Sequence, residues 1–400
     1  MHLCKYMNGD KLWNSNFIKI CIGNFLIKFS FTLIVPLLPL YLSETFGANN
    51  DTIGIILSCY TIMIILVSPF SGYIVDSFPR KAILLLCNFV FFALFAGYIA
   101  AGSLTVFAIF RTIHGAPFGT AVVSTNTVAI DVLPSSRRTE GISYFGLSNN
   151  LATALGPFAA VFVLKAAGGN YQMLFLFSMI MSLVALIVNS TIKLERRDCR
   201  TADKKVISLD RFFLVKGARQ AVNIMCFSFC YGVVSTYVAI YGKEELGITS
   251  GTGFWFLFFA IGLMVSRLTG AKGLKENKIS RNTAEGILAS IVGYFLFAAV
   301  RTEWAFYLAP FIIGLGNGHM YPGFQSMFVN LAHNSQRGTA NSSMLTSWEA
   351  GVGLGVLAGG VVSAHLGYHC AFWVALAVNF IGLVMFFTVS RSHFEKNKLR

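Results

Sequence analysis

The chain has 400 residues, of which 55% are hydrophobic and only 12% are charged, and its mean hydropathy is +0.66. Soluble domains carry about twice this share of charged residues, and no soluble fold of this size could bury so much apolar surface. The composition therefore excludes a soluble protein. The sequence also contains no HExxH, GxSxG or GxxxxGK[ST] motif, so nothing in it indicates a membrane enzyme or an ATP-driven pump.

Apolar runs of about 20 residues recur along the whole chain, and each is long enough to cross a hydrocarbon core about 30 Å thick. Helices satisfy their own backbone polar groups in lipid, whereas barrel strands would show alternating segments of about ten residues, which are absent here. We therefore predict an all-α membrane protein with twelve transmembrane helices. The expected spans are 17–43, 52–75, 82–101, 104–130, 142–164, 171–192, 217–241, 251–271, 283–301, 304–331, 340–363 and 369–390.

The net charge of +14 could suggest a nucleic-acid partner, but its distribution argues against one. With the N-terminus inside, all but six of the 31 Lys and Arg fall in cytoplasmic segments or the helix ends that adjoin them. This bias is the positive-inside rule. We predict a multi-pass protein of the inner (plasma) membrane with both termini in the cytoplasm. The six exceptions are Lys165, Lys243 and Arg301 in external loops and Lys28, Arg111 and Arg267 within spans.

Eight cysteines are scattered along the chain, mostly within spans. Cys226 and Cys230 share one helix face, but a lone pair of cysteines does not make a metal site. We expect these side chains to serve packing, and we predict neither a metal nor a cofactor.

The chain divides into two similar halves. Its longest polar stretch, Glu195 to Arg211, lies near the middle and is expected to be a solvated linker. Shifting the second half by 198 or 199 residues aligns several features at four helix positions. We therefore predict an N-terminal six-helix bundle (1–193), a cytoplasmic linker (194–213) and a C-terminal six-helix bundle (214–400), with the substrate held between the bundles. The aligned features are Asn24 with Asn223, 67–72 with 265–270, Gly115 and Gly119 with Gly314 and Gly318, Arg138 with Arg337, and 148–156 with 347–355.

The loop between the second and third spans reads Gly72-Tyr-Ile-Val-Asp76-Ser-Phe-Pro-Arg80-Lys81. It resembles the loop signature of the major facilitator superfamily, and the resemblance extends over essentially the whole chain. In that family the loop holds the cytoplasmic side shut in one conformation. The resemblance implies that Asp76 and Arg80 act as a gate, with Asp131 and the start of the helix near Gly338 as partners. An ordinary charged loop that only sets topology is the alternative.

The fourth span carries Arg111-Thr-Ile-His114-Gly115-Ala-Pro-Phe-Gly119, which is similar to a conserved helix of the same superfamily. In its drug antiporters the arginine is implicated in proton coupling or in anion contact. A charge at the middle of a span costs about 2.5–3.5 kcal/mol, so Arg111 is expected to face a cavity or a carboxylate, unless it snorkels to the outer headgroups. His114 could titrate near neutral pH or be a hydrogen-bonded structural histidine.

The fifth span contains Gly156-Pro157, which resembles the glycine-proline signature of proton-coupled exporters. Proline removes a backbone donor and kinks the helix, which would allow a gate to flex there. Together with Arg138, which follows the fourth span, these residues complete the predicted gating set. The resemblance implies the drug or metabolite antiporter branch of the family.

Glu349 is the one carboxylate that the predicted spans place near the membrane midplane. Burial disfavours its charged form, which suits a group that binds and releases a proton as access alternates. It could instead stay permanently protonated, or serve as counter-ion to a cationic substrate or to Lys28. Lys28 is also deep, in the first span, and is expected to contact the substrate or to pair with Glu349, unless it snorkels. Other expected cavity residues are Asn24, Phe29, Asn149, Asn150, His319 and Trp348.

We therefore expect a secondary transporter that works by alternating access, and the favoured activity is proton-coupled efflux of a small, partly apolar drug or metabolite. A proton symporter or facilitator for uptake of a small nutrient is the alternative, and a receptor or scaffold is a remote one. The expected partners are a small-molecule substrate, a proton or other coupling ion, and the lipid bilayer, with the protein acting as a monomer.

Overall fold

The computed structural model describes residues 11–134, 138–194, 213–248, 252–275, 278–333 and 337–399, and the regular structure in these ranges is helical. The first half contains α1 (Ser15–Ile34), α2 (Leu38–Phe46), α3 (Asn50–Ser77), α4 (Arg80–Ala100), α5 (Leu104–Asp131), α6 (Arg138–Ala166) and α7 (Tyr171–Ser190). The second half contains α8 (Ala218–Glu244), α9 (Thr252–Lys275), α10 (Ile279–Ala299), α11 (Glu303–Leu331), α12 (Arg337–Met385) and α13 (Arg391–Asn397).

Side-chain caps define where several helices begin. Asn14, Asn49, Ser103 and Asn170 each precede a helix and accept a hydrogen bond from a backbone N–H of its first turn. Such caps satisfy donors that have no partner inside the helix. Between α1 and α2 a short 3-10 turn at Pro36 leaves the path continuous, so the two helices form one apolar crossing.

The predicted spans each coincide with a helix or part of one. Within the described residues, nine helices are long and apolar enough to cross a membrane, and a shorter apolar stretch covers Thr252–Ser266 of α9. The last two predicted spans lie in α12, a helix of 49 residues that turns back at Gly367, except that the final five residues form a π-helical turn, Phe386–Ser390. Gly367 has φ +82°, a conformation that favours glycine. A straight helix of that length would be far longer than the bilayer core.

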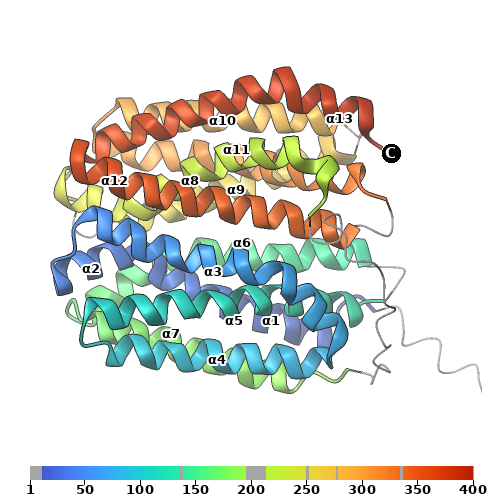
Figure 1. Cartoon of the computed structure of the whole chain (residues 1–400), viewed down its shortest axis with the longest axis horizontal. Helices are drawn as coiled ribbons and strands as arrows, with labels where there is room; N and C mark the ends of the chain where they lie inside the picture. Colours follow the sequence, from blue (N-terminus) through green and yellow to red (C-terminus); the bar gives the residue numbers. More distant parts are fainter. Residues whose placement is uncertain are drawn as a thin grey trace, which may run out of the picture.

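The helices form two halves, with the first half (blue to green) below the second (yellow to red) in Figure 1. In the first half α1 packs on α6 and α7, and α5 packs on α3 and α4. In the second half α8 packs on α12, and α11 packs on α9 and α10. This confirms the predicted two-bundle fold. The linker at 195–212 lies outside the described residues, so its boundaries stay a prediction.

The internal repeat is visible in helix packing. Gly115 of α5 lies against the backbone of Tyr60 in α3, so close that a Cβ would overlap the Tyr60 carbonyl oxygen. Gly314 of α11 lies in the same way against Phe259 in α9. Both residues of this second pair stand 199 positions after their counterparts. Small residues allow such close approach of membrane helices, and here the two halves use them at equivalent places.

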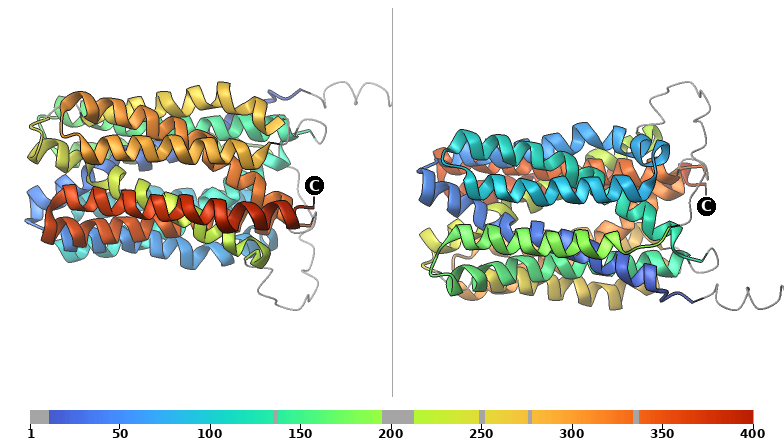
Figure 2. Two further views of the ribbon diagram at one scale, coloured as in Figure 1. Left: turned by 90° about the horizontal axis from the view of Figure 1, so that it is seen from above. Right: turned by 90° about the horizontal axis from the view of Figure 1, so that it is seen from below.

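Both ends of the described chain lie at one end of the bundle, called here the terminal end, as Figure 2 shows. The opposite, distal end joins the two halves. There α3 packs on α12 and α6 on α9, and a Cβ at Gly54 of α3 would lie 3.1 Å from the Cα of Gly360 in α12. Asn50 donates from Nδ2 to the Tyr368 hydroxyl at 3.1 Å. In this structure the halves are therefore in contact at the distal end.

An ion pair between Glu44 of α2 and Lys243 of α8 also joins the halves at the distal end. The Tyr171 hydroxyl donates to the same carboxylate at 2.9 Å. Glu44 and Lys243 are 199 positions apart, the shift that relates the repeats, so equivalent positions of the two halves meet with opposite charges. A strict repeat would have placed like charges together here.

Reversing one of these charges should favour separation of the distal ends. We expect Lys243→Glu to shift the population toward a distal-open state, and the double variant Glu44→Lys with Lys243→Glu to restore the wild-type distribution. The pair is partly exposed, so its contribution is about 0.2–1 kcal/mol. Spin labels at Gly102→Cys and Arg301→Cys, both exposed and outside the pair, would report the distance distribution. A single reversal without effect, or a double variant that resembles it, would contradict the role of the pair.

Candidate functional site

Lys28 of α1 and Glu349 of α12 belong to different halves, and both side chains are half-buried. Each charge acts electrostatically on the other, although no direct ion pair joins them among the described residues. The Lys28 ammonium lies 5.1 Å from the ring centroid of Phe118 and 5.9 Å from that of Phe31. These are cation–π contacts, which partly replace the lost hydration of the ammonium. The structure thus places two of the three deep charges, one from each half, within electrostatic reach of each other.

Arg111 of α5 is 3% exposed, so it does not snorkel toward the headgroups. Its guanidinium carbon lies 4.1 Å from the ring centroid of Tyr60 and 5.4 Å from that of Phe31. Nε and Nη1 have no hydrogen-bond partner. Arg111 is therefore a buried cation held over aromatic rings. It shares Phe31 with Lys28, which places both cations around one aromatic cluster.

His114 is completely buried, and its Nδ1 lies 2.7 Å from the hydroxyl of Tyr98 in α4. The rings of Phe91 and Phe95 pack on it with centroids at 4.4 and 4.9 Å. The Tyr98 hydroxyl also interacts with the Arg111 guanidinium. These contacts describe a hydrogen-bonded structural histidine, which indirectly helps to hold Arg111. A role of His114 in proton coupling stays a prediction.

Tyr60 of α3 is a residue of this group that sequence reasoning missed. It is 3% exposed, its hydroxyl has no hydrogen-bond partner, and its electrostatic neighbours include both Arg111 and Glu349. Tyr231 of α8 is a second omission, because it also lies within electrostatic reach of Glu349. A tyrosine in an apolar span ordinarily indicates packing, so neither residue stood out by its pattern alone.

Trp348 joins this central group from the second half. Its ring lies 5.8 Å from that of Tyr231 and 5.1 Å from that of Tyr321 in α11, centroid to centroid. Because Trp348 precedes Glu349 directly, these aromatic rings lie beside the carboxylate-bearing turn of α12. The role of Trp348 in substrate binding stays a prediction.

The other expected cavity residues make contacts within their own halves. Asn24 donates to the Ser148 hydroxyl at 2.8 Å and to Oδ1 of Asn149 at 3.0 Å, which ties α1 to α6. Phe29 stacks on Phe25 of its own helix at 5.5 Å. Nδ1 of His319 lies 2.9 Å from Oδ1 of Asn282 in α10. Asn150 is half-buried on α6. Their roles in substrate binding stay predictions.

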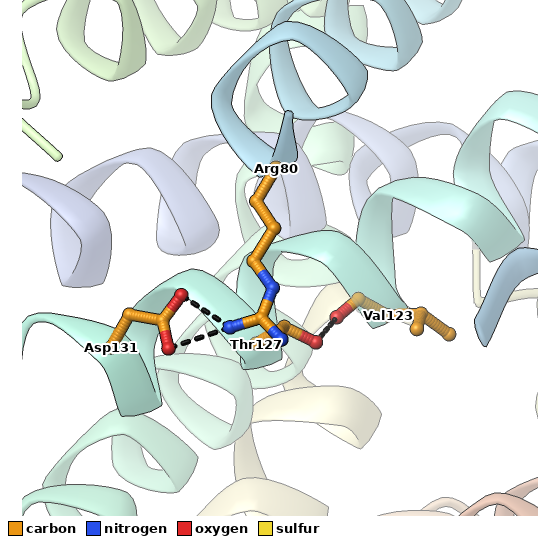
Figure 3. Close-up of polar contacts among 4 residues, drawn as sticks. All are labelled: Arg80, Val123, Thr127 and Asp131. Carbon is orange, nitrogen blue, oxygen red and sulfur yellow. Dashed lines mark hydrogen bonds and ion pairs between the residues drawn. The ribbon is translucent and has the colours of Figure 1, made fainter. Parts of the chain in front are cut away.

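At the terminal end, Arg80 and Asp131 form an ion pair, with Nη1 at 2.6 and 2.5 Å from the two carboxylate oxygens (Figure 3). Arg80 is the first residue of α4 and Asp131 the last of α5. Each charge has the sign that its own helix dipole disfavours, so their pairing offsets both unfavourable positions. The backbone of α3 includes residue 76, but the side chains of Asp76 and Arg138 lie outside the described residues.

Gly156 of α6 lies directly against α1, where a Cβ would overlap the Thr32 hydroxyl. Close packing of the two helices therefore requires a glycine here. Pro157 follows inside the helix and is buried. The position suits a flexible point next to α1, and its function as a hinge stays a prediction.

Comparison with known proteins identifies the family. The model of the Major Facilitator Superfamily matches residues 20–284 and 285–400. The chain is 24% identical to the uncharacterized MFS-type transporter YtbD of Bacillus subtilis (strain 168), over 89% of this chain and 90% of that protein. It is 21% identical to the quinolone resistance protein NorA of Staphylococcus aureus (strain MRSA252), over 94% and 96%.

Solved structures agree with this result at the level of the fold. A crystal structure of a mutant of the nucleoside transporter NupG superimposes with a TM-score of 0.75 at 14% identity, over 93% of this chain and 99% of that chain. Because the family model covers nearly the whole sequence, the chain is a membrane transporter, not an enzyme, and belongs to the Major Facilitator Superfamily.

Proposed function

We propose that this protein exports a small, partly apolar molecule in exchange for protons. The observation that carries the proposal is that Lys28 and Glu349 belong to different halves and lie within electrostatic reach of each other. Beside them α12 packs closely on α3, where a Cβ at Gly353 would lie 2.9 Å from Cγ2 of Thr61. When the halves move relative to each other, the interaction between these two charges must change. Protonation of Glu349 would remove one partner of that interaction, so proton binding and conformation are linked.

The energy available from such coupling is sufficient for uphill transport. Each proton that moves inward through the membrane potential supplies about 2.3 kcal/mol per 100 mV, and the pH gradient adds to it. Glu349 is half-buried where the halves meet, so it could exchange protons with one side and then with the other. The positive charge of Lys28 favours the ionised state of Glu349 whenever the two groups are close.

The surroundings of these charges suit a partly apolar substrate. Aromatic side chains from both halves surround the site, and ligand pockets are typically apolar with a few polar groups that set orientation. The similarity to a quinolone resistance protein supports drug export. The likeness to a nucleoside transporter is one of fold only. Proton movement in the same direction as the substrate would indicate symport instead of export by exchange. The aromatic residues are Phe31, Tyr60 and Phe118 of the first half and Tyr231, Tyr321 and Trp348 of the second.

We infer that the terminal end faces the cytoplasm, because most of the basic residues lie in the segments predicted there. The distal contact between the halves would then close the site toward the outside in this conformation. In the opposite conformation, the pair of Arg80 with Asp131, together with Asp76 and Arg138, would act at the cytoplasmic gate, and Gly156-Pro157 would allow α6 to flex.

The coupling role of Glu349 can be tested by neutralising its charge. In proteoliposomes that contain a pH indicator, transport of a quinolone by the wild type should move protons in the opposite direction. We expect Glu349→Gln to reduce this proton movement to the level of protein-free liposomes, because the amide cannot exchange a proton. Glu303→Gln, an exposed acid at the distal end, is the matched control. Full proton exchange by Glu349→Gln would refute the assignment, and protons that accompany the quinolone would show symport.

Arg111→Met separates a functional role from a structural one. Arg111 has no carboxylate partner among the described residues, so its removal leaves no charge unpaired. A buried cation in a membrane costs about 2.5–3.5 kcal/mol, and we therefore expect an unchanged or raised Tm in detergent. Quinolone transport should fall strongly in the same variant. If Tm drops and transport persists in the folded fraction, Arg111 is a structural residue.

A further inference from the structure

Comparison of the two halves separates the polar groups that the fold needs from those that it does not. Residues 199 positions apart occupy equivalent places, as the packing of Gly115 and Gly314 shows. At the central site, the polar groups have no like counterpart in the other half. The unmatched pairs are Lys28 and Phe227, Arg111 and Pro310, Glu349 and Asn150, and Tyr60 and Phe259.

Tyr60 is the informative member of this set, because only one atom distinguishes it from its counterpart. Gly115 packs against the backbone carbonyl of Tyr60, and Gly314 packs in the same way against the backbone carbonyl of Phe259. Phe259 is 3% exposed, as is Tyr60. The fold therefore needs an aromatic ring at this place in each half, and the hydroxyl of Tyr60 is an addition that packing does not require.

Burial of the Tyr60 hydroxyl lowers the stability of the folded protein. The hydroxyl is buried and has no hydrogen-bond partner in this structure, and burying an unpaired hydroxyl is unfavourable. The ring below it stacks on Phe31 with centroids 5.0 Å apart and carries the Arg111 guanidinium 4.1 Å from its centroid. A phenylalanine would make both contacts without the penalty, so a partner for the hydroxyl is expected in another state of the protein.

The ionisable groups around the hydroxyl come from several helices. Arg111 of α5, Tyr98 of α4 and Glu349 of α12 all lie within its electrostatic reach. Glu349 is itself within reach of Lys28 in α1 and of Tyr231 in α8. The backbone geometry agrees, because a Cβ at Gly353, one turn after Glu349 in α12, would lie 2.9 Å from Cγ2 of Thr61, the neighbour of Tyr60 in α3. Tyr60 therefore carries the buried cation of the first half on its ring and has the deep carboxylate of the second half within electrostatic reach.

The hydrogen-bonding chemistry of Arg111, Tyr60 and Glu349 decides which group donates to which. A guanidinium can only donate hydrogen bonds, an ionised carboxylate can only accept them, and a phenol can do both. Arg111 retains two nitrogens without a partner, Nε and Nη1. A chain from Arg111 through the Tyr60 hydroxyl to ionised Glu349 would therefore give the hydroxyl both a donor and an acceptor, and one Arg111 nitrogen a partner. Bonds in such chains also polarise one another.

We propose that Tyr60 is a positioning residue that donates its hydroxyl proton in a hydrogen bond to Glu349 when that carboxylate is ionised. Its ring contacts the Arg111 guanidinium and its hydroxyl bonds Glu349, so loss of the Glu349 proton changes the contacts of a residue that also holds Arg111. The inference rests on the proposed function in one respect, because it takes Glu349 as the group that exchanges protons. It assigns to Tyr60 no direct contact with substrate.

The hydrogen bond favours the ionised carboxylate, so its loss should favour the protonated one. In Tyr60→Phe, Glu349 should therefore keep its proton to higher pH. A hydrogen bond to a charged group is strong enough to move the midpoint of the titration by about one pH unit. Folding should be unaffected, because Phe259 makes the same glycine contact with a bare ring at the equivalent place in the second half.

Infrared difference spectroscopy of the purified full-length protein in lipid measures this midpoint without any substrate. The carboxyl band of protonated Glu349 is identified by its loss in Glu349→Gln and is followed over a pH series. We expect an upward shift of the midpoint in Tyr60→Phe. Tyr294→Phe is the matched control, because the Tyr294 side chain is likewise 3% exposed, and Glu349 is not among its electrostatic neighbours.

The outcomes separate this inference from the proposed function. A midpoint that is the same in wild type and Tyr60→Phe, or that shifts equally in Tyr294→Phe, overturns the role of Tyr60 and leaves proton exchange at Glu349 intact. A carboxyl band that does not titrate in the wild type overturns both. A shift that is specific to Tyr60→Phe supports the inference, even if the liposome experiment shows that quinolone transport moves no protons.

Discussion

The constraint on which this structure depends is the cost of charge inside a membrane. Each charge at the middle of a span costs about 2.5–3.5 kcal/mol, and Lys28, Arg111 and Glu349 all lie deep in the bundle. Aromatic rings receive the two cations, and the carboxylate interacts with Lys28 from the other half. Because this interaction crosses the interface, the electrostatic energy of the site depends on how the two halves are arranged.

The two repeated halves differ at a few polar positions. The two halves share their close helix contacts, so Gly115 and Gly314 serve the same purpose in each. Two sets of unlike residues at equivalent positions lie where the halves meet. At the distal end equivalent positions carry Glu44 and Lys243 and form an ion pair. At the centre the unmatched polar groups converge around Tyr60, so the asymmetry of the repeat marks both the contact and the site.

Features that depend on local sequence could be predicted, and those that depend on tertiary contacts could not. The spans and the repeat follow from hydropathy and from a constant shift, so Gly115 and Gly314 could be paired in advance. Lys28 and Glu349 stood out because charge is rare in a span. Tyr60 did not, because a tyrosine in an apolar run is indistinguishable from packing until Arg111 and Glu349 are seen beside it. Likewise, the partner of His114 lies on another helix, at Tyr98.

Access of water to the deep charges is the most direct test of this arrangement. In a variant without native cysteines, Lys28→Cys and Glu349→Cys would be treated in lipid with a water-soluble thiol reagent, with Ile62→Cys, a side chain 50% exposed on the bundle surface, for comparison. Modification at positions 28 and 349 but not at 62 is the predicted result. If 28 and 349 are as unreactive as 62, these charges do not face a shared aqueous space between the halves.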